Sequence, residues 1–180
     1  MLDEIERLCG RLEQSRTRVL DLVEATDQRQ RSVQQAEGKW SMLQVIDHLI
    51  LAEEGTLRVF EQGPPPEPKV KVRSLLALRA IEGLFGLRLR LRVPSKSLTP
   101  REPESLEALR LRWTVASDGI TQYAGALEPD DLRQPRFRHP VAGWVTVGQG
   151  LDFLERHIRH HERQIHRIRR SLAAAHRAGA

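Results

Sequence analysis

Two histidines separated by one helical turn, His157 and His161, are the residues whose spacing points most directly to chemistry. Apolar residues around them recur every three or four positions, which places His161 in the stripe that its own helix turns toward a core. His157 lies one turn earlier and about 40° around the helix axis. Two imidazoles at this spacing can hold one metal ion at about 2.0–2.1 Å from each nitrogen.

A third histidine, His48, faces inward from a different predicted helix, in line with Val45, Ala52 and Gly55. An unsatisfied polar group among aliphatic side chains costs roughly 2 kcal/mol or more, so a buried imidazole needs hydrogen-bond partners or a metal. Two interpretations stay open at this point. The three histidines share one cation, or each is a core histidine bonded to a backbone carbonyl or water.

The remaining histidines differ in position from these three. His160 points about 100° away from His161 on a helical wheel, and His166 about 140° away, so both belong at the flank or in solvent. His176 lies in a fraying tail. None of the three is a good ligand candidate.

The elements that must position the histidines are four long amphipathic helices. Capping-box signatures, Ser41 with Gln44 and Thr146 with Gln149, begin the second and the last of them. Thr99 and Ser105 compete to begin the third. The predicted helices cover residues 2–29, 41–62, 105–127 and 146–175. With no convincing sheet and prolines marking a loop before the last helix, we predict one all-α domain over residues 1–180, a four-helix bundle.

A basic connection, residues 64–99, links the second and third helices. Ser74 to Gly86 has the pattern of a short helix, whereas residues 87–92 alternate like a strand. Since a lone strand has no partner, we favour a helix that frays into an extended connection. Phe85 is the sole aromatic residue there, so bases would find almost no stacking surface and we do not expect a nucleic-acid partner.

Composition narrows the class of protein. Hydrophobic residues make up 39% and aromatic residues 4% of the 180, and no stretch approaches the roughly 20 apolar residues of a membrane span. We therefore expect no membrane partner. The N-terminus is acidic and amphipathic rather than basic and apolar, and Cys9 is the single cysteine, which excludes an internal disulfide. These features indicate a cytoplasmic protein.

Three motifs resemble those of one known family. Residues 40–49, which read Trp-Ser-x-x-x-x-x-Asp-His-Leu, resemble the first motif of the DinB-like (YfiT-like) metalloprotein superfamily. Residues 157–165 are similar to its H-x-x-H-H-x-x-Q-I motif, and residues 139–146 to its HP-x-x-G-x-x-T approach to the last helix. The motifs have the order and spacing of that family.

The resemblance implies a DinB/YfiT-like four-helix bundle with a metal held by His48, His157 and His161. Members bind zinc, nickel or other divalent ions, and some are transferases or isomerases that use low-molecular-weight bacterial thiols. The basic connection is longer than in the compact members, which leaves the substrate open.

Three neutral imidazoles suit zinc or nickel and leave one coordination position for water or substrate. Gln164 falls on the ligand face and could orient a ligand, with helix packing as the alternative. His139 could act as an acid or base at the mouth of the site, with plain solvation as the alternative. Ile158 stands where a zincin helix needs its general-base glutamate, so peptidase activity is not expected.

Two functions remain in view, and a third, weaker idea is that residues 70–92 dock on an anionic membrane or nucleic acid. The first is a metal-dependent enzyme, a thiol transferase or a hydrolase, that acts on a small molecule. The second is a non-catalytic bundle, in one version a homodimer, whose metal is structural or absent.

Overall fold

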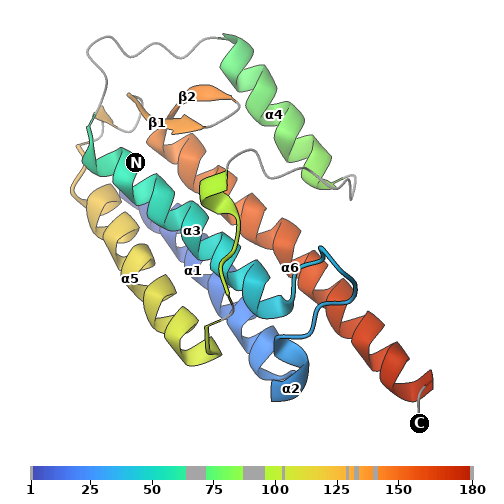
Figure 1. Cartoon of the computed structure of the whole chain (residues 1–180). Helices are drawn as coiled ribbons and strands as arrows, with labels where there is room; N and C mark the ends of the chain where they lie inside the picture. Colours follow the sequence, from blue (N-terminus) through green and yellow to red (C-terminus); the bar gives the residue numbers. More distant parts are fainter. Residues whose placement is uncertain are drawn as a thin grey trace.

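Four long helices lie side by side in the chain's computed structural model, with a hairpin at one end and a further helix outside the bundle (Figure 1). The structure describes residues 2–63, 72–86, 96–102, 104–128, 130–131, 134–139 and 142–178. This arrangement confirms the predicted helical bundle. In chain order the elements are α1 (Leu2–Glu24), α2 (Gln28–Arg31), α3 (Met42–Glu61), α4 (Val72–Gly86), the 3-10 turn η1 (Lys96–Leu98), α5 (Leu106–Gly125), β1 (Pro135–His139), β2 (Gly143–Thr146) and α6 (Val147–Ala178).

Both helices that carry the inward histidines begin at the predicted capping boxes. The Gln44 backbone N–H donates to the Ser41 hydroxyl at 3.2 Å, and the Ser41 N–H donates to the Gln44 side chain at 3.0 Å. Gln149 and Thr146 form the same reciprocal pair at the start of α6, at 3.3 and 2.9 Å. Each box satisfies two N–H groups that the first helical turn leaves without intrahelical partners.

Other helix boundaries refine the prediction. Ser105, one of the two predicted caps, begins α5. α1 ends at Glu24, earlier than predicted, because Asp27 caps the separate turn α2. α6 runs to Ala178, slightly beyond the predicted end.

The direction of the helices explains the long connection. α1 packs on α6, α3 packs on α5, and both α3–α6 and α1–α5 are also in contact. In Figure 1, α1 and α6 run one way along the bundle, and α3 and α5 run the other way. Because α3 and α5 are parallel neighbours, the chain must travel back along the bundle between them. None of the helices in the described part of the chain has both the length and the apolar content of a membrane span.

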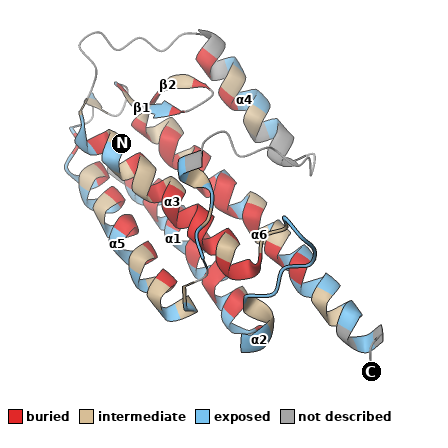
Figure 2. Ribbon diagram, viewed as in Figure 1, coloured by how far each residue is buried: buried red, intermediate tan, exposed pale blue. Residues whose placement is uncertain are grey.

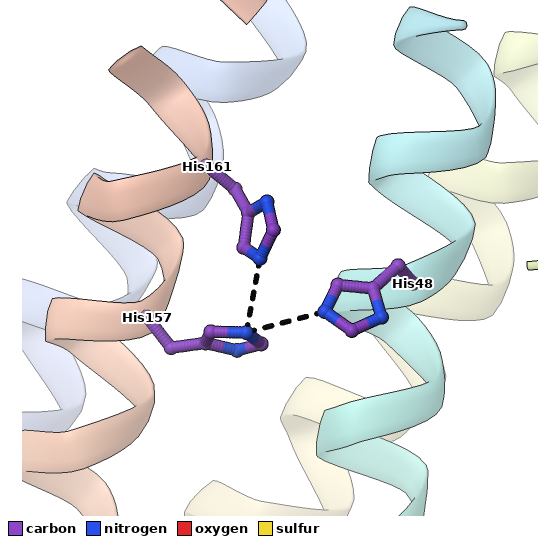
Figure 3. Close-up of side chains that lie close together, drawn as sticks. All are labelled: His48, His157 and His161. Atoms are coloured by element: carbon purple, nitrogen blue, oxygen red, sulfur yellow. Dashed lines mark hydrogen bonds between the residues drawn. The ribbon is translucent and has the colours of Figure 1, made fainter. Parts of the chain in front are cut away.

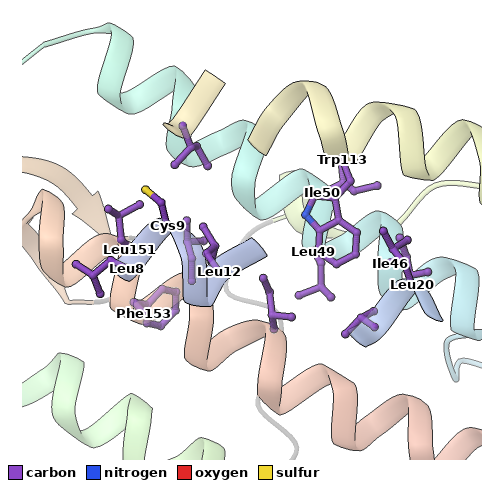
Figure 4. Close-up of a cluster of buried hydrophobic side chains, with 14 of the residues drawn as sticks. Leu8, Cys9, Leu12, Leu20, Ile46, Leu49, Ile50, Trp113, Leu151 and Phe153 are labelled. Carbon is purple, nitrogen blue, oxygen red and sulfur yellow. The ribbon is translucent and has the colours of Figure 1, made fainter. Parts of the chain in front are cut away.

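The core runs along the inside of the four long helices (Figure 2). Trp113 of α5 belongs to this core and is 1% exposed. Figure 4 shows it in a cluster of buried side chains that also come from α1, α3 and α6. Burying one leucine or isoleucine stabilises the fold by about 1.5–3 kcal/mol relative to leaving it in water. The fully buried large residues include Leu12, Met42, Ile46, Leu49, Ile50, Phe60, Leu109, Ile120, Leu151, Leu154 and Ile158.

A two-stranded antiparallel sheet replaces the loop predicted before the last helix, so the prediction of no sheet was wrong there. The strands are four and five residues long, too short to give a clear alternation. Gly143 turns the chain between them with a φ of 82°. The hairpin is stable because it packs on α3 and α6 and buries Ala142 and Val145, a tertiary effect that short patterns do not reveal.

α4 confirms the short helix predicted within the connection. It packs on α6 and β2, and its buried Ser74 lies close to Gly143. The alternating residues 87–92 lie outside the described part of the chain. The connection returns to the bundle at η1, which packs on α3.

Candidate metal centre

Two adjacent helices bring three histidines to one point inside the bundle (Figure 3). His48 projects from α3, and His157 and His161 project from α6 one turn apart. Each lies on the buried face of its helix, as the sequence predicts, and they are 4%, 9% and 8% exposed. Nitrogens from all three side chains lie within 4.8 Å of one another.

The spacing of these nitrogens fits a metal ion. His157 Nε2 lies 3.2 Å from His48 Nε2 and 3.1 Å from His161 Nε2. A tetrahedral ion bonded at about 2.0–2.1 Å holds its ligand nitrogens about 3.3–3.4 Å apart. The two contacts of His157 therefore need to lengthen by only a few tenths of an ångström to share one ion, and the ligand atoms of His48 and His161 lie within 4.8 Å of each other.

The partners of the outer nitrogens fix the tautomers of two rings. His48 Nδ1 donates to the Leu98 carbonyl oxygen at 2.7 Å, and His161 Nδ1 donates to Gln164 Oε1 at 2.8 Å. Because both oxygens only accept, both Nδ1 atoms carry the hydrogen, and the two Nε2 atoms present lone pairs to His157. The centre is thus complementary to a single shared proton or to one cation. Oriented outer hydrogen bonds of this kind accompany most metal-binding histidines.

Burial keeps the three rings neutral. Loss of solvent lowers the pKa of His48, although the Leu98 carbonyl and the Asp47 carboxylate partly oppose this. Desolvation, and then the neighbouring imidazoles, lower the pKa values of His157 and His161 well below 6.5. At neutral pH the lone pairs are therefore available to a metal rather than occupied by protons.

Aromatic rings close two sides of the centre. The Trp40 ring lies 4.8 Å from the ring of His48 and 6.5 Å from that of His161, centroid to centroid. Phe153, one turn before His157 on α6, stacks on it at 5.8 Å. These rings exclude water and restrict how the imidazoles can rotate.

The sequence model of the DinB superfamily matches residues 11–165. The chain belongs to the DinB superfamily. The match includes α3 and the part of α6 that carries the histidines, and it supports the resemblance seen in the motifs around Trp40 and His157. No curated protein and no solved structure matches the chain.

His139 takes a different place in this DinB-superfamily protein from the one expected of an acid or base at the mouth of the site. It is 5% exposed, and its Nδ1 accepts the Ala142 N–H at 2.9 Å within the hairpin turn. Its ring packs edge-on against Phe153 at 4.5 Å, so Phe153 lies between it and His157. Burial lowers its pKa to about 4. The geometry gives His139 a part in the turn and does not bring it into the nitrogen cluster.

The structure of this DinB-superfamily protein also places Gln164, His160 and His166 relative to the three histidines. Gln164 bonds to His161, so its side chain orients that imidazole. His160 is half-buried beside His161, and His166 is exposed, which matches their exclusion as ligands. The Leu98 carbonyl was missed, since a backbone acceptor from a distant segment leaves no signal in residue type.

Proposed function

We propose that this protein binds one divalent transition metal ion through His48, His157 and His161 and acts as a metal-dependent enzyme on a small molecule. The observation that carries the proposal is the convergence of three imidazole nitrogens, two of them with lone pairs set by outer hydrogen bonds. Nitrogen donors of this kind suit zinc or nickel better than magnesium or calcium. Three protein ligands leave a position open, as in catalytic rather than structural zinc sites.

The reaction class follows from what such a centre provides. A metal ion here supplies Lewis acidity that lowers the pKa of water or of a thiol. The chain's own part is to orient the ligands, through Leu98 and Gln164, and to exclude water, through Trp40 and Phe153. This arrangement supports a hydrolase or a thiol transferase, the latter with a low-molecular-weight thiol as co-substrate.

The first test is elemental analysis of untagged wild type and two variants. His157→Ala removes the central nitrogen, and His166→Ala is a matched control because it changes an exposed histidine on the same helix. We expect about one zinc or nickel ion per chain in the wild type and the control, and loss of metal in His157→Ala with unchanged helix content. Full occupancy in His157→Ala, or none in wild type after incubation with zinc, would contradict the proposal.

Burial of the three rings favours one alternative, a non-catalytic protein, monomer or dimer, whose metal is structural. Cobalt(II) substitution separates the two, because its visible spectrum responds to a change of ligand. A spectral shift on adding azide or 2-mercaptoethanol supports an open position and the enzyme. An unchanged spectrum, with a large loss of thermal stability on chelation, supports the structural role.

A further inference from the structure

The end of the long connection, residues 96–102, lies against α3 beside the metal centre. It holds the carbonyl that bonds His48, at Leu98 within the turn η1. This segment is not part of the four-helix bundle, and neither Leu98 nor Arg101 is buried. The tautomer of His48 therefore depends on how firmly an outer segment is held in place.

Asp47, the residue before His48, holds that segment. Its Oδ2 accepts the Arg101 backbone N–H at 2.8 Å, three residues after the Leu98 carbonyl. Two adjacent residues of α3, Asp47 and His48, thus each form one hydrogen bond with the segment. The carboxylate is 2% exposed, and a buried carboxylate needs donors on both oxygens.

Arg112 of α5 supplies the second donor. Its Nη1 donates to Asp47 Oδ1 at 2.8 Å and to a carboxylate oxygen of Glu104, two residues after the segment, at 2.6 Å. Its Nη2 donates to Glu54 of α3 at 3.1 Å. The guanidinium therefore fixes the direction of the Asp47 carboxylate, and with it the oxygen that receives the Arg101 N–H.

We infer that Asp47 is a positioning residue for the metal centre. It docks residues 96–102 so that the Leu98 carbonyl holds His48 as the tautomer with Nε2 free. The inference rests on the proposed metal binding, and it adds a coupling between metal binding and the docking of residues 96–102. Because linkage is reciprocal, docking of the segment tightens metal binding, and a bound metal stabilises the docked segment.

The informative variant is Asp47→Asn. Both partners of Asp47 are donors, whereas an asparagine of the same size has one accepting oxygen and turns an NH2 group toward the other donor. Asp152→Asn is a matched control, since Asp152 also accepts from two arginines, Arg11 and Arg156, at 3.0 and 2.8 Å, away from the cluster.

A second variant removes the contact without touching the ion pairs. Arg101→Pro deletes the N–H that Asp47 accepts and leaves Asp47 and Arg112 in place. Residue 101 is exposed and outside any helix, so the bundle does not depend on it. Circular dichroism verifies that both variants keep their helices.

Three measurements test the coupling: zinc affinity by competition with a chelating dye, the His48 tautomer from imidazole nitrogen shifts, and amide exchange of Arg101. In Asp47→Asn we expect a 10–100-fold loss of zinc affinity, a loss of the Nδ1–H tautomer in the metal-free protein, and faster Arg101 exchange. Arg101→Pro should repeat the first two effects, and Asp152→Asn should show none. In wild type, zinc should slow Arg101 exchange.

Unchanged zinc affinity in Asp47→Asn and Arg101→Pro, in protein whose wild type binds zinc, would overturn the inference and leave the proposed function standing. So would an intact Nδ1–H tautomer in both variants. A wild type that binds neither zinc nor nickel would instead overturn the proposed function, and the coupling with it.

Discussion

Replacing His139 by asparagine should change how the stability of the metal-free protein depends on pH. Burial lowers the pKa of His139 from 6.5 to about 4. As pH falls below 6.5 the unfolded chain takes up a proton at this residue, and the folded chain does so only near pH 4. Acid therefore favours unfolding. The contribution of the neutral His139 ring to the free energy of unfolding is complete above pH 6.5, is lost as pH falls toward 4, and changes no further below that.

The magnitude follows from the separation of the two pKa values. Each pH unit between them corresponds to about 1.4 kcal/mol, and at pH 5 the folded ring has only begun to protonate, so the loss between pH 8 and pH 5 is about 2 kcal/mol. Asparagine does not titrate, and its amide oxygen can accept the Ala142 N–H in place of Nδ1. The free energy of unfolding of wild type should therefore fall by about 2 kcal/mol relative to that of His139→Asn as pH falls from 8 to 5.

Urea unfolding followed by circular dichroism measures this difference, with a chelator present so that metal release adds nothing. His166→Asn, at an exposed position on α6, is the control and should show a constant offset from wild type. An offset for His139→Asn that stays constant within about 0.5 kcal/mol from pH 8 to 5 would refute a buried neutral imidazole at this position.

Two further predictions use the same unfolding assay. Gly143→Ala should destabilise the fold by about 1–2 kcal/mol, since the φ of 82° at this position disfavours a side chain. Gly10→Ala should stabilise it by about 0.5–1 kcal/mol, because Gly10 lies inside α1 with open space around it. Effects of the same sign for both substitutions would contradict this reasoning. Burial raises the pKa of Glu53 from 4.5 to about 7, with Arg16 opposing, so this carboxyl stabilises at low pH and loses that stability as pH rises toward 7. Glu53→Gln should therefore gain stability relative to wild type from pH 5 to 8, and an offset that does not change with pH would count against it.

Helical spacing and capping residues were enough to predict the bundle. The Ser41 and Thr146 boxes and the inward direction of the histidines depend on contacts within three or four residues, which a sequence displays directly. The hairpin was missed because its strands are short and owe their stability to packing on α3 and α6. The buried position of His139 follows from the same packing, and no local pattern separates it from a solvated loop histidine.

In the candidate metal centre too, one part could be predicted from the sequence and another could not, for a physical reason. Helix geometry decides where the nitrogens of His157 and His161 lie, since residues four apart share a face. It does not decide which nitrogen of each ring carries the lone pair, because that depends on the partner of the opposite nitrogen. For His161 the partner is Gln164 on the same helix, so the sequence can suggest it. For His48 the partner is the Leu98 carbonyl, fifty residues away, in a segment that Asp47 binds through the Arg101 N–H. Three histidines grafted onto a bundle without this segment would keep their positions, but His48 could then turn either nitrogen's lone pair toward the metal, with weaker binding as the result.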